Sequence, residues 1–524
     1  MKKLTLLLLS FCSTQFLFGQ NAPGIEWEKS LGGSNQDEAW SVQEFNDGNF
    51  LIVGSGGSND GDIWGEHGGG DYWVVRLNSN GDTVWTRCFG GSGFEQECKG
   101  QVTNDGGCVL VGLSLSNDGD VSGNHGSYDC WVIKLSSDGN LEWQKCLGGN
   151  EDDYGRSIVQ TSDSGYIVAS GAASDDGDVS GNHGDFDYWI VKLNSNGDTL
   201  WARCYGGSGF DEPYSISQTA DNGFIVAGRT TSNDGDVWGF HGYFDYWIVK
   251  LNSDGDTVWT KCLGGSEADE AFDIIQTSDG GFVVCGVSPS SDGDVYGNHG
   301  QADYWLVKLN SNGDTVWTRC YGGSGYDQAN SVQQTSDGGF ILAGWTTSND
   351  FDVSGFHGYD DYWIVKCDSA GSIEWSKCLG GSSGDLAAAI RQTNDGGYVI
   401  AGKSLSNDID VTGNHGELDY WIVKLSAEAT GIKTPASSLS FYISPNPTQG
   451  NFEITFPTLL QQHTTLSITN LLGQKLFSIG SCGEKEIPLN TSQQSFDFSQ
   501  WQKGMYFITI RDENSFGEKQ LVIQ

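Results

Sequence analysis

Apolar and polar residues alternate in short runs that recur along most of the chain. One unit contains four such runs, SVQQT (331–335), GFILAG (339–344), DYWIVK (361–366) and GSIEWSKC (371–378). Runs of this length, rich in β-branched and aromatic residues, are typical of β-strands. Turn sequences such as SDGG and NSNG separate them, and no 3.6-residue periodicity supports helices. The pattern therefore predicts four short antiparallel strands per unit.

The unit recurs seven times at an interval of 58 residues. Two tryptophan positions keep this interval without a gap, the first at Trp27, Trp85, Trp143, Trp201, Trp259, Trp317 and Trp375, the second at Trp73, Trp131, Trp189, Trp247, Trp305, Trp363 and Trp421. Seven units of four antiparallel strands predict an all-β fold, a seven-bladed β-propeller, over residues 21–426.

The two ends of the array indicate a closed ring. The seventh unit stops after YWIVKL (420–425) without a fourth strand, whereas the chain begins the array with an unmatched fourth strand, IEWEKS (25–30). Pairing these two segments would complete the last blade and cover both sheet edges. We expect residues 25–30 to pair with residues 420–425.

The segments outside the array have different compositions. Residues 1–20 begin with Lys2 and Lys3 followed by a short apolar run, which is typical of a signal peptide. No later segment approaches the ~20 apolar residues that a membrane helix requires, so we expect no membrane span. A small, polar linker (427–440) precedes a C-terminal domain (441–524) of unrelated sequence.

The C-terminal domain contains ISPNPTQGNFEITF (443–456), ITNLLGQKLF (468–477) and WQKGMYFITI (501–510). It resembles the C-terminal sorting domain of cargo proteins of the type IX secretion system of the Bacteroidota, a small β-sandwich. The matching residues are Pro445, Asn446, Pro447, Gly450, Gly473, Gln474, Gly504, Tyr506 and Lys519. The resemblance implies that the outer-membrane type IX secretion machinery is a partner and that the protein is secreted or held at the outer cell surface.

The charge of the chain narrows the choice of ligand. With 68 acidic and 27 basic residues the formal net charge is −41, which repels nucleic acid and anionic membranes. We expect no nucleic-acid partner, and a neutral ligand or a divalent cation instead. Four acidic positions recur in every unit, and the loops that carry most of them should project from one face of the propeller.

The recurring stretch SNDGDVSGNHG (116–126) has two interpretations. Its acids follow the spacing of a calcium-binding loop, with an acid of the following DYW-type triplet as the last ligand. On this interpretation calcium is a cofactor, and the candidate ligands in two successive units are Asp118, Asp120, Ser122, Asp129, Asp176, Asp178, Ser180 and Asp187. The fifth position is not constant, because other units carry Trp64, Trp238 and Tyr296 there.

The alternative interpretation is structural. Seven histidines, His67, His125, His183, His241, His299, His357 and His415, occupy one repeat position, and a catalytic histidine is rarely needed seven times. Histidine followed by Asp-Tyr-Trp is similar in its chemistry to WD-repeat propellers, in which such residues hydrogen-bond within a blade. A neutral imidazole would then bond the aspartate of the triplet, and the other acids would cap backbone N–H groups. Both interpretations stay open.

The cysteines predict one disulfide. Six of them follow the repeat and should lie too far apart to pair. The hairpin centred on Asp138, however, places Cys130 opposite Cys146, and export favours oxidation. We therefore expect a bond between these two residues, provided that the strand register is as assumed.

A specific function requires residues that break the sevenfold symmetry. The long loops carry such residues beside their carboxylates and amides, a combination suited to a neutral glycan. The candidate ligand-binding residues are Trp238, Phe240, Tyr243, Phe244, Trp345, Phe356, Tyr359 and Arg229. The sequence favours a non-catalytic binding or adhesion protein for a glycan or a protein partner, because no asymmetric pair of acids stands out. The alternative is a glycan-active hydrolase or lyase, endoglucanase-like, with its site on the loop-rich face.

Overall fold

The computed structural model describes residues 22–428, 437–438, 441–455, 465–470, 475–479, 493–511 and 515–524. The chain divides into two compact units with the boundary between Glu428 and Ala429, close to the predicted end of the propeller. The expected signal peptide (1–20) and most of the expected linker (427–440) lie outside the described residues.

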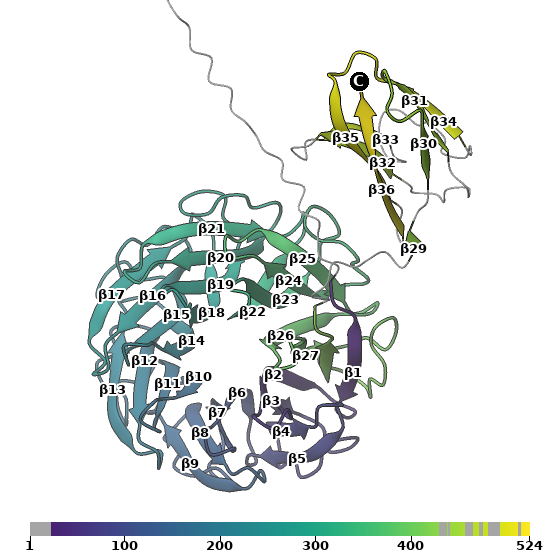
Figure 1. Ribbon diagram of the computed structural model, residues 1–524. Coiled ribbons are helices and arrows are strands. Elements are labelled where there is room, and N and C mark those ends of the chain that lie inside the picture. The colour runs from purple at the N-terminus through teal and green to yellow at the C-terminus, as the bar shows by residue number, and fades with distance from the viewer. Residues whose placement is uncertain are drawn as a thin grey trace, which may run out of the picture. The chain divides into compact units, whose positions relative to one another are not determined.

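The first unit is the predicted seven-bladed propeller (Figure 1). Blades 1 to 6 are the sheets β2–β5, β6–β9, β10–β13, β14–β17, β18–β21 and β22–β25, and blade 7 is formed by β26–β28 with β1. The innermost strands are β2 (Asp37–Glu44), β6 (Glu95–Val102), β10 (Asp153–Gln160), β14 (Asp211–Gln218), β18 (Glu270–Gln276), β22 (Asp327–Gln334) and β26 (Asp385–Gln392). The second strands are β3 (Phe50–Gly56), β7 (Cys108–Ser114), β11 (Tyr166–Ala172), β15 (Phe224–Thr230), β19 (Phe282–Ser288), β23 (Phe340–Thr346) and β27 (Tyr398–Ser404).

The two outer layers contain the repeated tryptophans. The third strands are β4 (Asp71–Leu77), β8 (Asp129–Leu135), β12 (Asp187–Leu193), β16 (Asp245–Leu251), β20 (Asp303–Leu309), β24 (Asp361–Cys367) and β28 (Asp419–Leu425). The outermost strands are β5 (Thr83–Phe89), β9 (Leu141–Leu147), β13 (Thr199–Tyr205), β17 (Thr257–Leu263), β21 (Thr315–Tyr321), β25 (Ile373–Leu379) and β1 (Ile25–Leu31).

The ring closes through its first and last strands, as the sequence predicts. Strand β1 pairs antiparallel with β28, from Ile25 opposite Leu425 to Leu31 opposite Tyr420. The side chains reinforce this closure, since the indole Nε1 of Trp421 donates to Glu28 at 3.1 Å. Blade 7 therefore combines strands from both ends of the propeller and leaves no unpaired third strand.

Six of the seven blades are fastened to the next by the tyrosine of the third strand, whereas blade 2 has Cys130 at that position. The Tyr72 hydroxyl, fully buried, donates to the backbone carbonyl of Trp131 in blade 2 at 3.1 Å. The two rings lie 4.7 Å apart. The same contact between tyrosine and tryptophan joins blades 3 and 4, 4 and 5, 5 and 6, 6 and 7, and 7 and 1. The core is therefore a continuous ring of interleaved blade faces.

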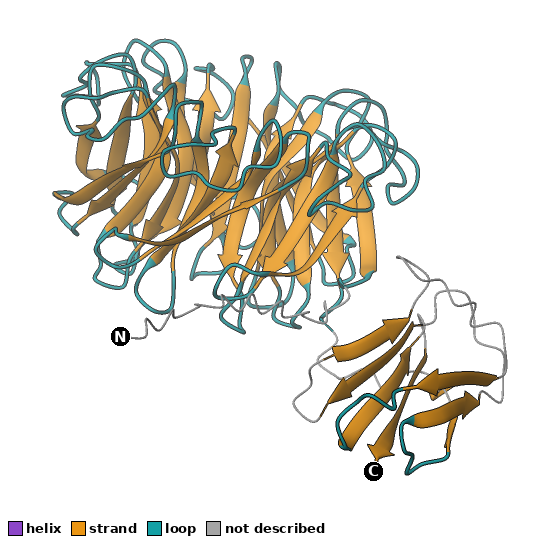
Figure 2. Ribbon diagram, turned by 90° about the horizontal axis from the view of Figure 1, so that it is seen from above, coloured by secondary structure: helices purple, strands orange, loops and turns teal. Residues whose placement is uncertain are grey.

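The two faces of the propeller differ in the length of their connections. Loops between blades and loops joining second to third strands lie on one face, which we call the loop face, and short turns lie on the other (Figure 2). On the turn face a buried lysine of the third strand pairs with an aspartate of the first turn, as Lys192 does with Asp163 at 3.0 Å. Equivalent ion pairs occur in the other blades, with Arg76 and Asp47 in blade 1.

The predicted disulfide is wrong, because the hairpin register differs by one residue from the one assumed. An irregularity between Lys134 and Leu135 shifts the pairing of β8 with β9, so that Cys130 lies opposite Leu147. Cys146 lies opposite Trp131 instead. The two thiols therefore belong to different packed clusters of the core, and both are free and buried.

The C-terminal unit is a two-sheet β-sandwich, as the sequence predicts. One sheet has the order β29 (Ser437–Ser438), β36 (Ser515–Ile523), β35 (Gly504–Arg511), β32 (Thr465–Asn470) and β33 (Lys475–Ile479), and the other has the order β30 (Tyr442–Ser444), β31 (Asn451–Thr455) and β34 (Gln493–Asp497). Apolar residues of both sheets, including Phe452 and Ile508, form its core.

The residues of the sorting motif hold the ends of this sandwich together. Asn446, between Pro445 and Pro447, donates its amide to the carbonyl of Gln520 at 2.6 Å and accepts from the Val522 N–H at 2.9 Å. Gly450 has a φ of +108°, and a Cβ there would lie 2.4 Å from the Cα of Ser499. Gly504 begins β35, and the Tyr506 hydroxyl donates to the Gln502 carbonyl at 2.6 Å. Gly473 lies outside the described residues.

Candidate functional site

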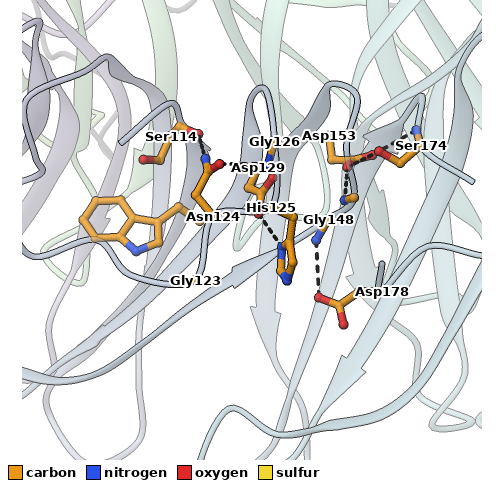
Figure 3. Close-up of polar contacts among 12 residues, drawn as sticks. Ser114, Gly123, Asn124, His125, Gly126, Asp129, Gly148, Asp153, Ser174 and Asp178 are labelled. Atoms are coloured by element: carbon orange, nitrogen blue, oxygen red, sulfur yellow. Dashed lines mark hydrogen bonds and ion pairs between the residues drawn. The ribbon is translucent and has the colours of Figure 1, made fainter. Parts of the chain in front are cut away.

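The repeated histidine and the aspartate of the third strand form a hydrogen-bonded pair in every blade (Figure 3). In blade 2 the fully buried Asp129 accepts from the backbone N–H of His125 at 3.1 Å and from its Nδ1 at 2.7 Å. The other six pairs have Nδ1 to Oδ2 distances of 2.5 to 2.9 Å. These contacts fit the structural interpretation of the motif, since a carboxylate acceptor places the proton of a neutral imidazole on Nδ1.

The acid that begins each innermost strand holds two loops together. Asp153 accepts from the N–H of Gly149 at 2.7 Å and from the hydroxyl of Ser174 at 2.8 Å. Burial, the strongest influence, raises the pKa of Asp153 to about 6, although these hydrogen bonds oppose it. Asp129 contributes to this rise, because its second oxygen and a carboxylate oxygen of Asp153 lie 3.0 and 2.7 Å from the position that a Cβ of Gly148 would take. Only glycine fits between these two acids.

The two acids of the opening motif accept from backbone N–H groups, as predicted, and these groups belong to the loop between blades. Asp176 accepts from the N–H of Asn150 at 2.8 Å. Asp178 accepts from the N–H of Gly148 at 3.4 Å (Figure 3). Asp118 and Asp120 cap Ser92 and Gly90 in the same way one blade earlier.

The candidate calcium ligands are therefore directed to different partners. Asp129 and Asp187 bind their histidines, Ser122 accepts from the amide of Gln144 at 2.6 Å, and Ser180 is exposed. Among the described residues, no group of three or more histidine, cysteine or acidic side chains is arranged to hold a metal ion. Calcium binding would require these side chains to leave their present hydrogen bonds. It stays a prediction.

The predicted ligand-binding residues fall into two groups. Trp238, Tyr243 and Tyr359 are 73, 68 and 76% exposed. The others are packed or paired: Phe240 lies against the core, Phe356 is half-buried, Phe244 lies against Phe210 and Arg229, and Trp345 stacks on Tyr326 with ring centroids 5.1 Å apart. These eight residues therefore do not form a single site.

Arg229 belongs to a closed ionic network on the channel side of blades 2 to 5. It pairs with Glu212 and with Glu270, both at 2.7 Å. Glu212 is 2% exposed and also accepts from Arg156 at 2.5 Å and from the hydroxyl of Tyr214 at 2.8 Å. Burial, the largest influence, raises the pKa of Glu212, but the two arginines outweigh it and hold that pKa below its usual value. The network fills this side of the channel mouth.

The opposite side of the channel mouth is open. A pocket of about 390 Å³ lies between blades 7, 1 and 2, and we call it the channel-mouth pocket. Its lining residues are Asn35, Gln36, Glu38, Trp40, Ser55, Gly56, Gly57, Gly69, Gly70, Phe94, Gln96, Glu97 and Glu417.

Two glycines create this opening. At the position of Gly70, blades 2, 3 and 4 carry Tyr128, Phe186 and Phe244, whose rings take part in the aromatic packing of the mouth. Blade 1 has no side chain there and none at Gly69. The pocket therefore exists because the repeat fails locally.

The polar groups of the pocket are only partly satisfied within the protein. Lys403 forms an ion pair with Glu38 at 3.1 Å and lies 4.9 Å from the centre of the Trp40 ring. The indole Nε1 of Trp40 and the hydroxyl of Ser55 are shielded from solvent and have no hydrogen-bond partner among the described residues. Two donors in the wall of the pocket thus lack a partner within the described part of the chain.

Glu97 adds strained backbone to the same pocket. Its φ is +56°, a conformation that side-chain-bearing residues rarely adopt. Four other blades have a fully buried alanine at this position, such as Ala39 and Ala271. A carboxylate cannot occupy that space, and the irregularity between Gln96 and Lys99 turns Glu97 toward the pocket, where it also pairs with Arg156. Strain of this kind is concentrated at functional sites.

Sequence reasoning missed the channel-mouth pocket, although three signals were present. Trp40 is one of the few tryptophans outside the repeat, Glu97 replaces a small residue, and Gly70 replaces a large one. These residues are far apart in the sequence and come together only where the blades are arranged around one axis.

Comparison with known proteins identifies the C-terminal domain. Residues 442–524 match the family described as secretion system C-terminal sorting domain. The chain is thus one that the type IX secretion machinery exports, and its location is the outer cell surface or the surrounding medium. Among the described residues no helix has the length and apolarity needed to cross a membrane.

The remainder of the chain is similar to other proteins only at low identity. A regulatory protein of Caulobacter vibrioides, FlaEY, is 26% identical over 212 residues, and this alignment covers 36% of the present chain and 22% of that protein. The Neurospora crassa Pan2 WD40 domain has 9% identity and a TM-score of 0.42 over 77% of this chain and 96% of that domain. Sqt1 from Chaetomium thermophilum has 10% identity and a TM-score of 0.37 over 76% of this chain and 100% of that protein.

Proposed function

We propose that the protein is an exported, non-catalytic glycan-binding propeller whose ligand occupies the channel-mouth pocket. The observation that carries this proposal is a pocket lined by the Trp40 ring, in which the indole Nε1 of Trp40 and the hydroxyl of Ser55 lack hydrogen-bond partners. An aromatic ring stacks on the apolar face of a sugar, and surrounding amides and carboxylates accept hydrogen bonds from its hydroxyls. The net charge of −41 favours a neutral glycan.

The pocket can be closed with side chains that the repeat itself supplies. Blade 2 has Leu113 at the position of Ser55, and blade 7 has Leu386 at the position of Gln96. Ser55→Leu and Gln96→Leu should therefore fold normally while removing a hydrogen-bonding group and part of the volume. We expect each to weaken binding of a glycan by about tenfold, the effect of about 1.4 kcal/mol.

The measurement is a glycan-array screen of the purified full chain followed by titration calorimetry with the best oligosaccharide. Gln328→Leu, at the same repeat position in blade 6 and outside the pocket, is the matched control. Unchanged affinity in both pocket variants would contradict the proposed site. Binding of a protein by the parent chain with no glycan bound would contradict the proposed ligand class.

A glycan-active hydrolase or lyase is a second candidate, because Glu38, Glu97 and Glu417 bring three carboxylates to the same pocket. Glycosidases act through a pair of acids on either side of the bond they cleave. Incubation of each bound glycan with the parent chain, followed by an assay for new reducing ends, tests this activity. Loss of turnover in Glu38→Gln or Glu97→Gln with binding retained would favour the enzyme over the binding protein.

A further inference from the structure

Three large side chains are exposed at one and the same position of the repeat. Trp64, Trp238 and Tyr296 are 72, 73 and 71% exposed, and we call them the rim aromatics. They lie in the loops that join the second and third strands of blades 1, 4 and 5. Single exposed aromatics are common on proteins, but three at equivalent positions are not scattered at random.

The backbone at this position is the same whether or not the side chain is aromatic. The following glycines, Gly65, Gly239 and Gly297, have φ values of +88°, +90° and +91°, and Gly181 and Gly355 have +83° and +82° after serines. The loop therefore has one conformation throughout the ring. An aromatic side chain is held outward by the repeat rather than by contacts of its own.

The rim aromatics have no structural task within the propeller. In residues 22–428 none of them makes a ring contact, a cation–π contact or a side-chain hydrogen bond with another residue. By contrast, in two other blades the equivalent side chain fastens the loop to the outermost strand. Ser122 accepts from Gln144, and Thr412 donates to Glu28, both at 2.6 Å. Replacing such a residue with an exposed ring gives up a contact and leaves apolar surface in water.

The chemistry around each ring excludes several partners. Every rim aromatic follows an aspartate two residues earlier, Asp62, Asp236 or Asp294, in a chain of net charge −41. Carboxylates at this density repel nucleic acid, anionic polysaccharides and anionic membranes. A neutral sugar ring remains as a partner, because it offers an apolar face to the aromatic ring and hydroxyls to the carboxylates.

We infer that the rim aromatics are three separate contacts for one class of ligand, a long neutral polysaccharide, which they hold in addition to the segment bound in the channel-mouth pocket. This inference rests on the proposed function and specifies that the natural ligand is a polymer. Each contact alone is weak, but contacts on one chain or on neighbouring chains of a polymer act together. None of the rim aromatics lines the channel-mouth pocket, so we expect an oligosaccharide that fills only this pocket to gain nothing from them.

The test compares polymer with oligosaccharide on the same variants of the full chain. Affinity gel electrophoresis in neutral β-glucan, galactomannan or xylan measures the polymer, and calorimetry with matched oligosaccharides measures the pocket. We expect Trp64→Ala, Trp238→Ala and Tyr296→Ala each to weaken retention by the polymer roughly three- to tenfold. The triple variant should lose retention while keeping its oligosaccharide affinity. Val258→Ala, another exposed apolar residue on β17, is the matched control.

A variant that gains a contact gives an independent readout. Ser180 is exposed on the same backbone in blade 3, so Ser180→Trp should place a fourth ring beside those of blades 4 and 5 and increase retention. Undiminished retention of the triple variant would overturn the inference. Oligosaccharide binding without any tighter binding of the polymer would overturn it while leaving the pocket intact. Failure of the parent chain to bind any neutral glycan would overturn the proposed function as well.

Discussion

Asp129 holds the imidazole of His125 in a fixed orientation through a 2.7 Å hydrogen bond between its Oδ2 and Nδ1. The carboxylate is fully buried, whereas the histidine side chain is 38% exposed. The histidine thus shields a buried charge from solvent and supplies the donor that this charge requires. The sevenfold recurrence of the pair makes it a structural element of the blade.

Removal of one histidine should destabilise the propeller locally. In His125→Ala the buried Asp129 keeps one backbone donor and loses the side-chain donor. We expect the free energy of unfolding to fall by about 1–3 kcal/mol, the cost of leaving a buried charged acceptor underbonded. Urea denaturation measures this change, with Ser180→Ala on the exposed part of the neighbouring loop as control. An unchanged midpoint would show that the imidazole contributes nothing to the blade.

The stability of the propeller should decrease as the pH rises from about 4 to about 7. Burial is the main cause that raises the pKa of Asp71 to about 7 and those of Asp37, Asp153, Asp187, Asp269, Asp303 and Asp361 to about 6. A carboxyl whose pKa is higher in the folded chain holds its proton more tightly there. Its stabilising contribution is complete below the unfolded pKa and is lost as the pH passes the folded pKa.

Three aspartates with lowered pKa values affect the free energy of unfolding only below this pH range. Burial raises the pKa values of Asp105 and Asp163, but hydrogen bonds and lysines outweigh it and lower them to about 2. Hydrogen bonds, foremost, and a lysine lower the pKa of Asp279 to about 2 against the effect of burial, so the contribution of all three is lost only under more acidic conditions. The free energy of unfolding, measured by denaturant titration between pH 4.5 and pH 7.5, should therefore fall with pH by at most about 1.4 kcal/mol per pH unit for each group. Asp71→Asn should reduce the slope. A slope of the opposite sign would contradict the raised pKa values of these buried carboxyls.

Two positions should be stabilised by a return to the glycine of the repeat. Phe351 and Ile409 stand where five units have glycine, and their φ values are +51° and +59°. They are also 70 and 59% exposed. We expect Phe351→Gly and Ile409→Gly each to raise the free energy of unfolding by about 1 kcal/mol, because the left-handed conformation costs about 1–2 kcal/mol for an L-residue. A lower melting temperature would show that these side chains make stabilising contacts.

The thiols of Cys130 and Cys146 should be free and protected. Burial, the main cause, raises the pKa of both thiols well above the usual value, so neither forms the reactive thiolate near neutral pH. We expect the folded chain to react slowly with thiol reagents and the unfolded chain to react at once. Peptide mapping without reduction should recover both as thiols. Recovery of a linked peptide would show that the register of β8 and β9 differs from that described.

The architecture could be predicted because the strands of one blade recur in the sequence every 58 residues. The spacing of Trp27 and Trp73 with their equivalents gave the blades, and the unmatched segment at residues 25–30 gave the ring closure. The cysteine pairing could not be predicted, because an irregularity between Lys134 and Leu135 shifts by one residue every pair of that hairpin that lies farther from the turn. Sequence alone does not locate such an irregularity.

The candidate site was harder to predict from the sequence, because it depends on contacts between blades. Aromatic residues such as Phe244 suggested a binding surface, yet the ring places them next to Arg229 and its acids, where they are satisfied by one another. The pocket depends on what is missing at Gly70 and on the turned backbone of Glu97. Both effects arise only when inner strands from three blades converge.

The pairing of β1 with β28 also sets an order of events for the chain. Glu28 and Trp421 are separated by 393 positions, so the last blade stays incomplete until nearly all of the propeller has been synthesised. Until then the third strand of blade 7 has a free edge, and the first strand has no partner. The sorting domain begins at residue 442, after β28, so a chain long enough to carry this domain already contains every strand that closes the ring.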